Sequence, residues 1–367
     1  MIEAIIAAIG MCADGVAEGM YAIRHKFSAR AAGFGYAIGA ALTWFYGAVT
    51  PITFTVESIT VATRTARTRP QIMHIVVLSA IPSIILGFFG LYSAFVEILN
   101  EAVIGGIIAG VGIILTEVGA GYVKEKVHTA GLSTLGGVVA YLLTENLVWV
   151  IVASVVLGTL AERYMPERFR KENEGNGEED GQEEENGENG GDRFGLIKLN
   201  PKEWISRPVI IGAFSVFALR TGAVVSYDTV NSNLAGIEPH LDGVTLMAGL
   251  GSLASALMGG GPIETTPAPM ADTPDPVFST ALFMALMAGI TLLGLVKRAG
   301  DYVPLQAIAG FLIVLGIFVI LPDELPLVAE NPLPGAAALA VTALSNPFYG
   351  ILAGEAVVLI MMLGVGG

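Results

Sequence analysis

The chain has 367 residues, of which 53% are hydrophobic and 14% are charged, and its formal net charge is −14. Soluble domains usually carry about 25% charged residues, so this composition excludes an ordinary soluble domain. Several apolar runs reach the roughly 20 residues that cross a bilayer. We therefore predict an all-α polytopic membrane protein that passes many times through the plasma membrane.

The predicted membrane spans form two sets of seven, separated by a polar linker. In the first set we expect spans at 2–23, 31–49, 71–90, 101–121, 132–144 and 147–162, with a short broken span at 50–62. In the second set we expect spans at 208–230, 243–258, 276–296, 302–321, 334–344 and 347–365, with another broken span at 259–270. The first run lacks a basic leader, so we interpret it as a retained span rather than a signal peptide.

The linker, residues 166–207, separates a first repeat at 1–165 from a second repeat at 208–367. Its stretch 172–192 holds ten acidic residues and no Lys or Arg, so most of the net charge is local. A Gly/Glu/Asn-rich stretch of this kind cannot bury a core, and we predict that it is disordered. The acidity says little about partners, and we expect no nucleic-acid partner.

The two broken spans share a sequence pattern. Pro51-Ile52-Thr53-Phe54-Thr55 matches Pro262-Ile263-Glu264-Thr265-Thr266 at an offset of 211. Prolines and β-branched residues prevent a continuous helix and favour an extended path. Irregular backbone at membrane depth survives only where it is buried in protein or lines a polar cavity. Broken spans in corresponding halves predict a transporter's binding site, with the two breaks meeting at mid-membrane.

Matched glycines and asparagines indicate that the two halves are repeats. Gly90, Gly106 and Gly112 match Gly294, Gly310 and Gly316 at an offset of 204, and Asn146 matches Asn346 at an offset of 200. Seven spans in each half make the second repeat inverted in the membrane. Of the 19 Lys and Arg residues, all except Arg220 fall on one side of these spans. The positive-inside rule places that side, with the linker, in the cytoplasm and both termini outside.

The predicted solute-binding residues lie on the broken spans. Glu264 can accept N–H groups of a planar heterocycle or take up a proton, and its alternative role is as a structural partner of Arg220 or of backbone amides. The threonines offer hydroxyls, and Phe54 offers a face for stacking or packing. The full set is Glu264, Thr265, Thr266, Thr53, Phe54 and Thr55.

Ionisable side chains inside a membrane are costly, so each is a candidate functional residue. Asp14 and Glu18 lie four residues apart on one helix face. Aligning the first span with 208–230 puts Asp14 next to Arg220, which predicts an ion pair that is either functional or purely structural. The coupling or charge-pair candidates are Asp14, Glu18, Arg220, Asp228 and Glu57.

No motif indicates an enzyme. The sequence lacks a phosphate-binding loop, a zinc signature and a nucleophile–base pair, and its single cysteine, Cys12, offers no metal cluster. We therefore expect no catalytic residues, no cofactor and no bound metal.

Two further segments carry a resemblance. The run from Met247 to Gly260, Met-Ala-Gly-Leu-Gly-Ser-Leu-Ala-Ser-Ala-Leu-Met-Gly-Gly, leads into the second break, and Tyr227-Asp228-Thr229-Val230 is similar to a phrase of purine permeases. With the seven-plus-seven plan, the chain resembles the nucleobase–cation symporters (the xanthine/uracil/purine permease family) and, more distantly, the sulfate-permease-like anion transporters. Pro267-Ala268-Pro269 stands where the family places a carboxylate after its Thr-Thr pair.

The resemblance implies how the spans would be organised. Spans one to four and eight to eleven would form a core domain, and spans five to seven and twelve to fourteen a gate domain that joins two copies as a homodimer. The solute would bind between the broken spans, and transport would follow an elevator-like movement of core against gate.

Three functions stay open at this stage. The leading hypothesis is a secondary active transporter of a nucleobase-like solute, coupled to protons or sodium. The second is an anion transporter or channel that uses Arg220 and helix N-termini for sulfate, bicarbonate or a carboxylate. The third is a non-transporting membrane scaffold with the same fold.

Overall fold

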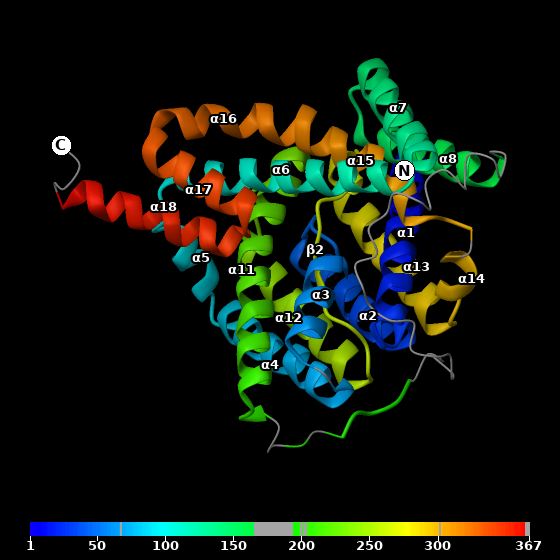
Figure 1. Ribbon diagram of the computed structural model, residues 1–367, viewed down its shortest axis with the longest axis horizontal. Coiled ribbons are helices and arrows are strands. Elements are labelled where there is room, and N and C mark those ends of the chain that lie inside the picture. Colours follow the sequence, from blue (N-terminus) through cyan, green and yellow to red (C-terminus); the bar gives the residue numbers. More distant parts are fainter. Residues whose placement is uncertain (67, 165–193, 199, 201–203, 301, 364–367) are drawn as a thin grey trace.

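The computed structural model describes residues 1–66, 68–164, 194–198, 200, 204–300 and 302–363, and helices make up most of it (Figure 1). The elements in chain order are α1 (Ile2–Arg24), α2 (Ala29–Tyr46), β1 (Ile52–Phe54), α3 (Val56–Thr65), α4 (Arg69–Phe88), α5 (Leu91–Val96), α6 (Glu101–Glu125), α7 (Val127–Thr144), α8 (Leu147–Tyr164), α11 (Arg207–Ala235), α12 (Leu241–Leu257), β2 (Ile263–Thr265), η1 (Pro269–Asp272), α13 (Pro276–Leu292), α14 (Val296–Gly300), η2 (Leu305–Ile308), α15 (Ala309–Val314), η3 (Leu315–Ile320), α16 (Leu321–Glu330), α17 (Pro332–Leu344) and α18 (Pro347–Met362).

The helices have the lengths and surfaces of membrane spans. Within the described residues, six are long and apolar enough to cross a bilayer, and four more are apolar with 10–17 residues. Large apolar side chains face outward, as at Phe45, Leu143 and Leu344, which are 77%, 79% and 90% exposed. The prediction of an all-α membrane protein is confirmed, whereas the count of fourteen spans stays a prediction.

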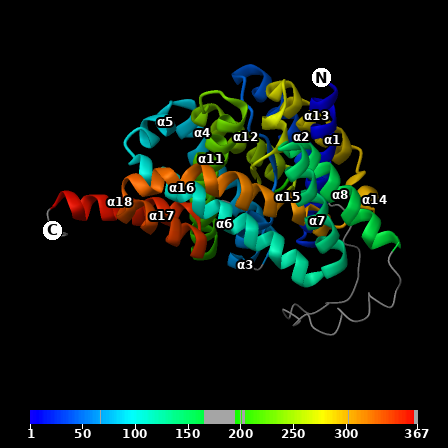
Figure 2. The same ribbon diagram turned by 90° about the horizontal axis from the view of Figure 1, so that it is seen from above.

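The helices pack in two groups. In one group α2 packs against α12 and α13, and α4 packs against α11 and α12; in the other, α6 packs against α15, α16 and α17, and α7 packs against α8. Figure 1 shows α6 and α16 crossing above the first group, and Figure 2 shows the same arrangement from above. We call the first of these two helix groups the strand group (α1–α4 and α11–α13, with β1 and β2) and the second the crossing group (α6–α8 and α15–α18).

The two broken spans meet as a small antiparallel sheet. Ile52 pairs with Thr265, Thr53 with Glu264, and Phe54 with Ile263, so the register is symmetric about its centre. The first strand leads into the ten-residue helix α3, whereas the second is followed only by the four-residue 3₁₀ turn η1. Pro267 and Pro269 remove backbone donors there, which explains why a longer half-helix does not form.

Two of the three matched glycine pairs have related surroundings. Gly90 and Gly294 each follow a long helix and have left-handed backbone, with φ of 66° and 68°. Gly112 and Gly316 face each other where α6 meets η3, and a Cβ added at Gly316 would lie 2.3 Å from the Gly112 carbonyl oxygen. Only glycine allows this approach.

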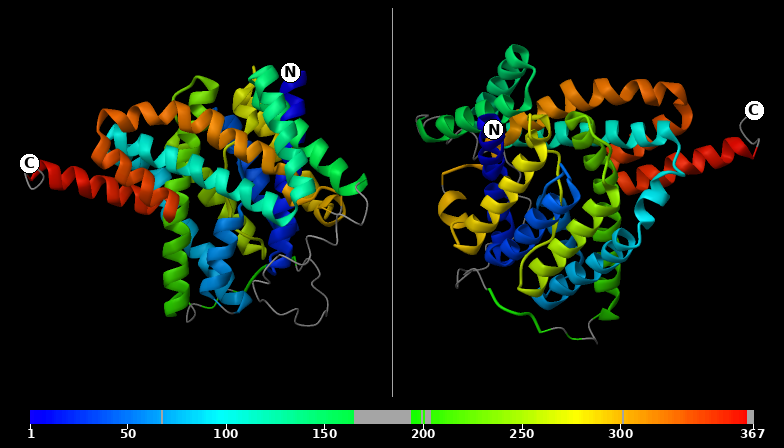
Figure 3. Two further views of the ribbon diagram at one scale, coloured as in Figure 1. Left: turned by 45° about the horizontal axis from the view of Figure 1, so that its top comes forward. Right: turned by 180° about the vertical axis from the view of Figure 1, so that it is seen from behind.

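Two predicted boundaries need correction. The span predicted at 302–321 continues as η2, α15, η3 and α16 to Glu330, with Pro322 and Pro326 inside this continuous helix. The predicted disordered linker lies mostly outside the described residues. Within its described residues 194–198, Gly195 and Ile197 donate backbone hydrogen bonds to Met258 and Leu257 at the end of α12. Figure 3 shows this segment at the end of the molecule where α11 begins.

Candidate functional site

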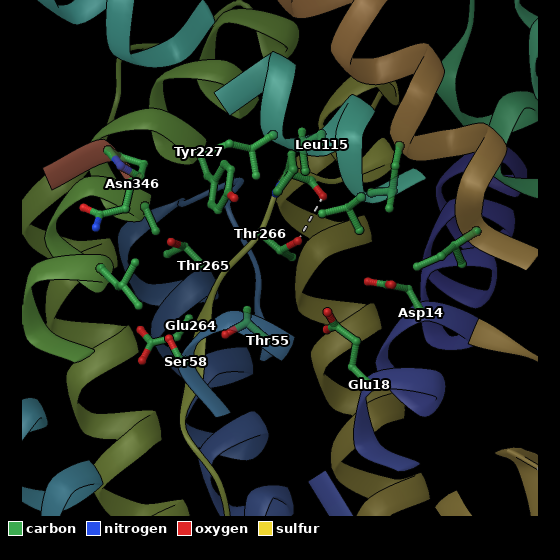
Figure 4. A pocket seen from close by; sticks show the side chains of 18 of the residues that line it. Asp14, Glu18, Thr55, Ser58, Leu115, Tyr227, Glu264, Thr265, Thr266 and Asn346 are labelled. Atoms are coloured by element: carbon green, nitrogen blue, oxygen red, sulfur yellow. Dashed lines mark hydrogen bonds between the residues drawn. The ribbon is translucent and has the colours of Figure 1, made fainter. Parts of the chain in front are cut away.

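A cavity of about 370 Å³ lies beside the paired strands, between the strand group and the crossing group. Its walls come from α1, α3, α11 and β2 on one side and from α6, α15 and the start of α18 on the other (Figure 4). The predicted site residues that line it are Asp14, Glu18, Thr55, Arg220, Glu264, Thr265 and Thr266. The structure thus gathers residues from both broken spans and from α1 around one space.

Arg220 and Glu264 form a bidentate ion pair at this cavity. Nε and Nη2 of Arg220 donate to the two carboxylate oxygens of Glu264 at 2.6 and 2.7 Å. The side chains are 1% and 2% exposed. Nη1 of Arg220 also donates to the carbonyl oxygen of Ser79 at 2.8 Å and to the hydroxyl of Ser83 at 3.2 Å. Good geometry and additional hydrogen bonds are what a buried ion pair needs to offset its desolvation.

The ion-pair partner of Arg220 is Glu264, whereas the sequence predicted Asp14. The strand pairing explains this choice, because it brings Glu264 into the middle of the sheet beside α11. Asp14 and Glu18 lie on α1 at another part of the cavity wall, where Figure 4 shows both carboxylates directed toward the open space. The alternative role of Glu264, a structural partner of Arg220, describes its contacts correctly.

Two hydroxyl groups at the cavity are available to a ligand. The Oγ1 atoms of Thr55 and Thr265 are buried and have no hydrogen-bond partner among the described residues, although both residues line the cavity. Buried hydroxyls are normally hydrogen-bonded, so such unpartnered atoms require an explanation. A solute with acceptor atoms would satisfy them.

Two predicted solute contacts lie away from the cavity. Phe54 is fully buried and packs edge-on against Tyr36, with ring centroids 5.8 Å apart. The Thr53 hydroxyl lies 2.8 Å from the hydroxyl of Tyr36, which also accepts from the backbone N–H of Phe54. Neither residue lines the cavity. Both residues are instead engaged by Tyr36 of α2. The side chain of Glu57 lies outside the described residues.

Asp228 belongs to a network behind the strands. The Thr50 hydroxyl donates to its carboxylate at 2.6 Å, and the side-chain nitrogen of Asn231 lies 3.3 Å from the same hydroxyl. Asn231 also donates to the carbonyl oxygen of Thr266 and accepts from the backbone N–H of Ala268. One turn of α11 therefore connects the segments that flank both breaks.

Several polar residues of the cavity wall were not among the predicted site residues, and three of them show where the signal was missing. Tyr227 comes from α11, Ser58 from α3, and Asn346 from the turn before α18. Asn346 was noted only as a repeat match, yet its side chain accepts from the backbone N–H of Tyr349 and caps α18. An asparagine beside a proline at a span boundary is a recognisable capping signal, but nothing in the sequence indicates that the cap borders the cavity.

The described residues contain no group of three or more His, Cys, Asp or Glu side chains that could hold a metal ion. The cavity is instead acidic with one basic group. Its charged lining residues are Asp14, Glu18, Glu125, Glu264 and Arg220.

Comparison with known proteins identifies the fold. No protein-family model and no curated protein sequence matches the chain. Among solved structures, it is similar to the transmembrane domain of a cyanobacterium bicarbonate transporter, BicA, with a TM-score of 0.53 and 18% identity over 96% of this chain and 97% of that one. The fold is that of a transporter's membrane domain. At this identity, the likeness establishes the fold alone.

The likeness covers nearly the whole chain, so the fold of both halves is that of a multi-pass membrane domain.

Proposed function

We propose that this protein is a secondary active transporter of a small anion, which binds in the cavity beside Arg220. The observation that carries the proposal is the convergence of a buried guanidinium with the unpartnered hydroxyls of Thr55 and Thr265. Hydroxyl and guanidinium groups donate hydrogen bonds, and charge-assisted bonds to an oxyanion are among the strongest. The likeness of the fold to a bicarbonate transporter domain supports the same class of solute.

The N-terminus of α3 adds to the attraction for an anion. This ten-residue helix begins directly after Thr55, and Ser58 in its first turn lines the cavity. Free N–H groups and the helix dipole give a helix N-terminus a partial positive charge. The break in the first span thus provides both a hydroxyl and a positive helix end at one place.

The charges of the cavity also require a companion cation. Four carboxylates and one guanidinium line it, so an anion that entered alone would meet a net negative wall. Repulsion between like charges is strong where water is limited. We propose that a proton or a sodium ion is carried with the anion, with Asp14 and Glu18 as its first candidates. This keeps the coupling expected from the sequence while changing the solute.

Glu264 would regulate access to Arg220. In the structure it occupies two of the guanidinium N–H groups, so an anion and the carboxylate compete for the same donors. Neutralising Glu264 with a proton would release these donors to the solute. We propose that the cycle then proceeds by movement of the strand group against the crossing group, because the cavity lies between them.

The test compares uptake of anions with uptake of nucleobases. Phe54, the predicted stacking residue, lies off the cavity, so the side chain that favoured a planar heterocycle does not line the site. The experiment measures uptake of radiolabelled bicarbonate, sulfate, a dicarboxylate, uracil and xanthine into proteoliposomes, under an imposed proton or sodium gradient.

We expect gradient-driven uptake of an anion and none of the nucleobases. Thr265→Val should raise the KM for that anion, whereas Thr63→Val should leave it unchanged, because the Thr63 hydroxyl is bonded to its own helix. Uptake of a nucleobase, or of no solute at all, would contradict the proposal. The latter result would favour the scaffold function.

A further inference from the structure

A second cavity, of about 80 Å³, lies between α11 and the run of helix from η3 into α16. Asn233 lines it from α11, and Asp323 and Glu324 line it from α16. It shares no lining residue with the cavity at Arg220. Because α11 belongs to the strand group and α16 to the crossing group, a ligand in this second cavity would bridge the two groups.

Glu324 supplies the feature that points to a ligand. Its side chain is only 5% exposed, and its Oε2 atom has no hydrogen-bond partner in the described part of the chain. The predicted span ends at residue 321, before Glu324, whereas the continued helix runs to Glu330 and buries this side chain. A buried carboxylate is costly unless a positive charge or hydrogen-bond donors accompany it. Asp323, on the same cavity wall, adds a second carboxylate and increases the need for positive charge.

Basic side chains on the neighbouring helices are too distant to supply that charge. Glu324 lies beside the start of α6, because its carbonyl oxygen would be 3.4 Å from a Cβ built at Gly105. Lys124 is 19 residues further along α6, which corresponds to about 28 Å. On α11, Arg220 is 13 residues from Asn233, about 20 Å, and is engaged by Glu264.

The backbone next to the cavity is unusual. The six residues Leu315–Ile320 form a π-helix immediately before α16. Such wide turns occur frequently at functional sites, where they change the direction in which the following side chains point. Val319 and Ile320, the last two residues of the π-helix, line the second cavity together with Glu324.

We propose that the second cavity binds a hard metal cation, either an alkali or an alkaline-earth ion. The ligands are the carboxylate oxygens of Glu324 and Asp323 and the side-chain oxygen of Asn233. Oxygen donors of this kind suit such ions, and water completes their coordination when the protein supplies few ligands. The bound ion neutralises Glu324 and holds α11 against α16. This site is distinct from the proposed anion site, so each can fail without the other.

The test uses the full-length protein purified in detergent. Its apparent Tm is measured in choline chloride and again with sodium chloride or calcium chloride at equal ionic strength. A ligand that binds only the folded state raises the Tm, and we expect a rise on the order of 5 °C with at least one of these ions. Glu324→Gln should abolish the rise. Glu330→Gln, which alters an exposed acid on the same helix, should keep it.

Direct binding provides the second readout. Wild-type protein should retain radiolabelled sodium or calcium in equilibrium dialysis, and Asn233→Leu should weaken that binding by roughly tenfold, the effect expected for losing one ligand contact. The proposal is overturned if the wild type responds to neither ion, or if Glu324→Gln responds as the wild type does. Stabilisation by acid alone, with no metal retained, would show that a proton neutralises Glu324 and would also overturn it. If Glu324→Gln does not fold, Asn233→Leu and the dialysis decide.

Discussion

Replacing either Arg220 or Glu264 by Gln should destabilise the protein more than replacing both. Each single change leaves one buried charge without its partner, which costs roughly 3–5 kcal/mol. Arg220→Gln also loses the hydrogen bonds to Ser79 and Ser83, each worth about 1 kcal/mol, so it should be the more severe of the two. The double variant loses those bonds but leaves no unpaired charge. With about 5–7 kcal/mol for Arg220→Gln, about 3–5 kcal/mol for Glu264→Gln and about 2 kcal/mol for the double variant, the interaction energy between the two sites is at least about 6 kcal/mol.

Thermal unfolding in detergent measures this cycle. With about 2 °C of Tm per kcal/mol for a large domain, Glu264→Gln should lose roughly 6–10 °C and Arg220→Gln roughly 10–14 °C, and the double variant should lie closer to the wild type. The exposed pair of Lys126 and Glu162, which are 45% and 27% exposed, is the matched control. Its interaction energy should stay below about 1 kcal/mol. If the effects of Arg220→Gln and Glu264→Gln simply add, the buried pair is not energetically coupled and the reasoning is wrong.

Three further variants test the framework around the site. Asn231→Ala removes the side chain that connects both breaks, so initial rates of anion uptake should fall by up to about 100-fold, and unchanged rates would show that the network does not position the strands. Tyr36→Phe removes a hydroxyl, so the backbone N–H of Phe54 loses its acceptor and the Thr53 hydroxyl loses its partner. The free energy of unfolding should fall by about 1–3 kcal/mol, and an unchanged value would exclude this role. Gly35→Ala should cost about 1–3 kcal/mol, because its Cβ would lie 2.4 Å from the Gly251 carbonyl oxygen where α2 meets α12, and an unchanged Tm would mean that the helices separate freely.

The sequence predicted the meeting of the two broken spans because its signals are local. Proline next to β-branched residues excludes a helix, and a repeated pattern identifies equivalent positions. The pairing itself, with Thr53 opposite Glu264, follows the symmetry of the repeats. That symmetry also accounts for the matched left-handed glycines, Gly90 and Gly294, each at the end of a long helix.

The partners within the site could not be predicted in the same way. An ion pair between Arg220 and Glu264 depends on which face of α11 turns toward the sheet, and an apolar helix with a weak amphipathic pattern does not indicate its buried face. Asp14 was expected as the partner because aligning the first span with 208–230 puts it next to Arg220, and Phe54 was expected at the solute because it lies on a broken span. Glu324 was misplaced because prolines normally indicate a helix end, whereas here α16 continues past Pro326.

The proposed function requires an anion to bind at Arg220 between the two broken spans. Equilibrium binding of radiolabelled bicarbonate and sulfate to purified protein tests this most directly, with the Arg220→Gln/Glu264→Gln double variant compared with the wild type. We predict saturable binding by the wild type, none by the double variant, and wild-type binding by the Lys126→Gln/Glu162→Gln control. Binding of the same anion by the Arg220→Gln/Glu264→Gln variant with an unchanged Kd would contradict the proposed site.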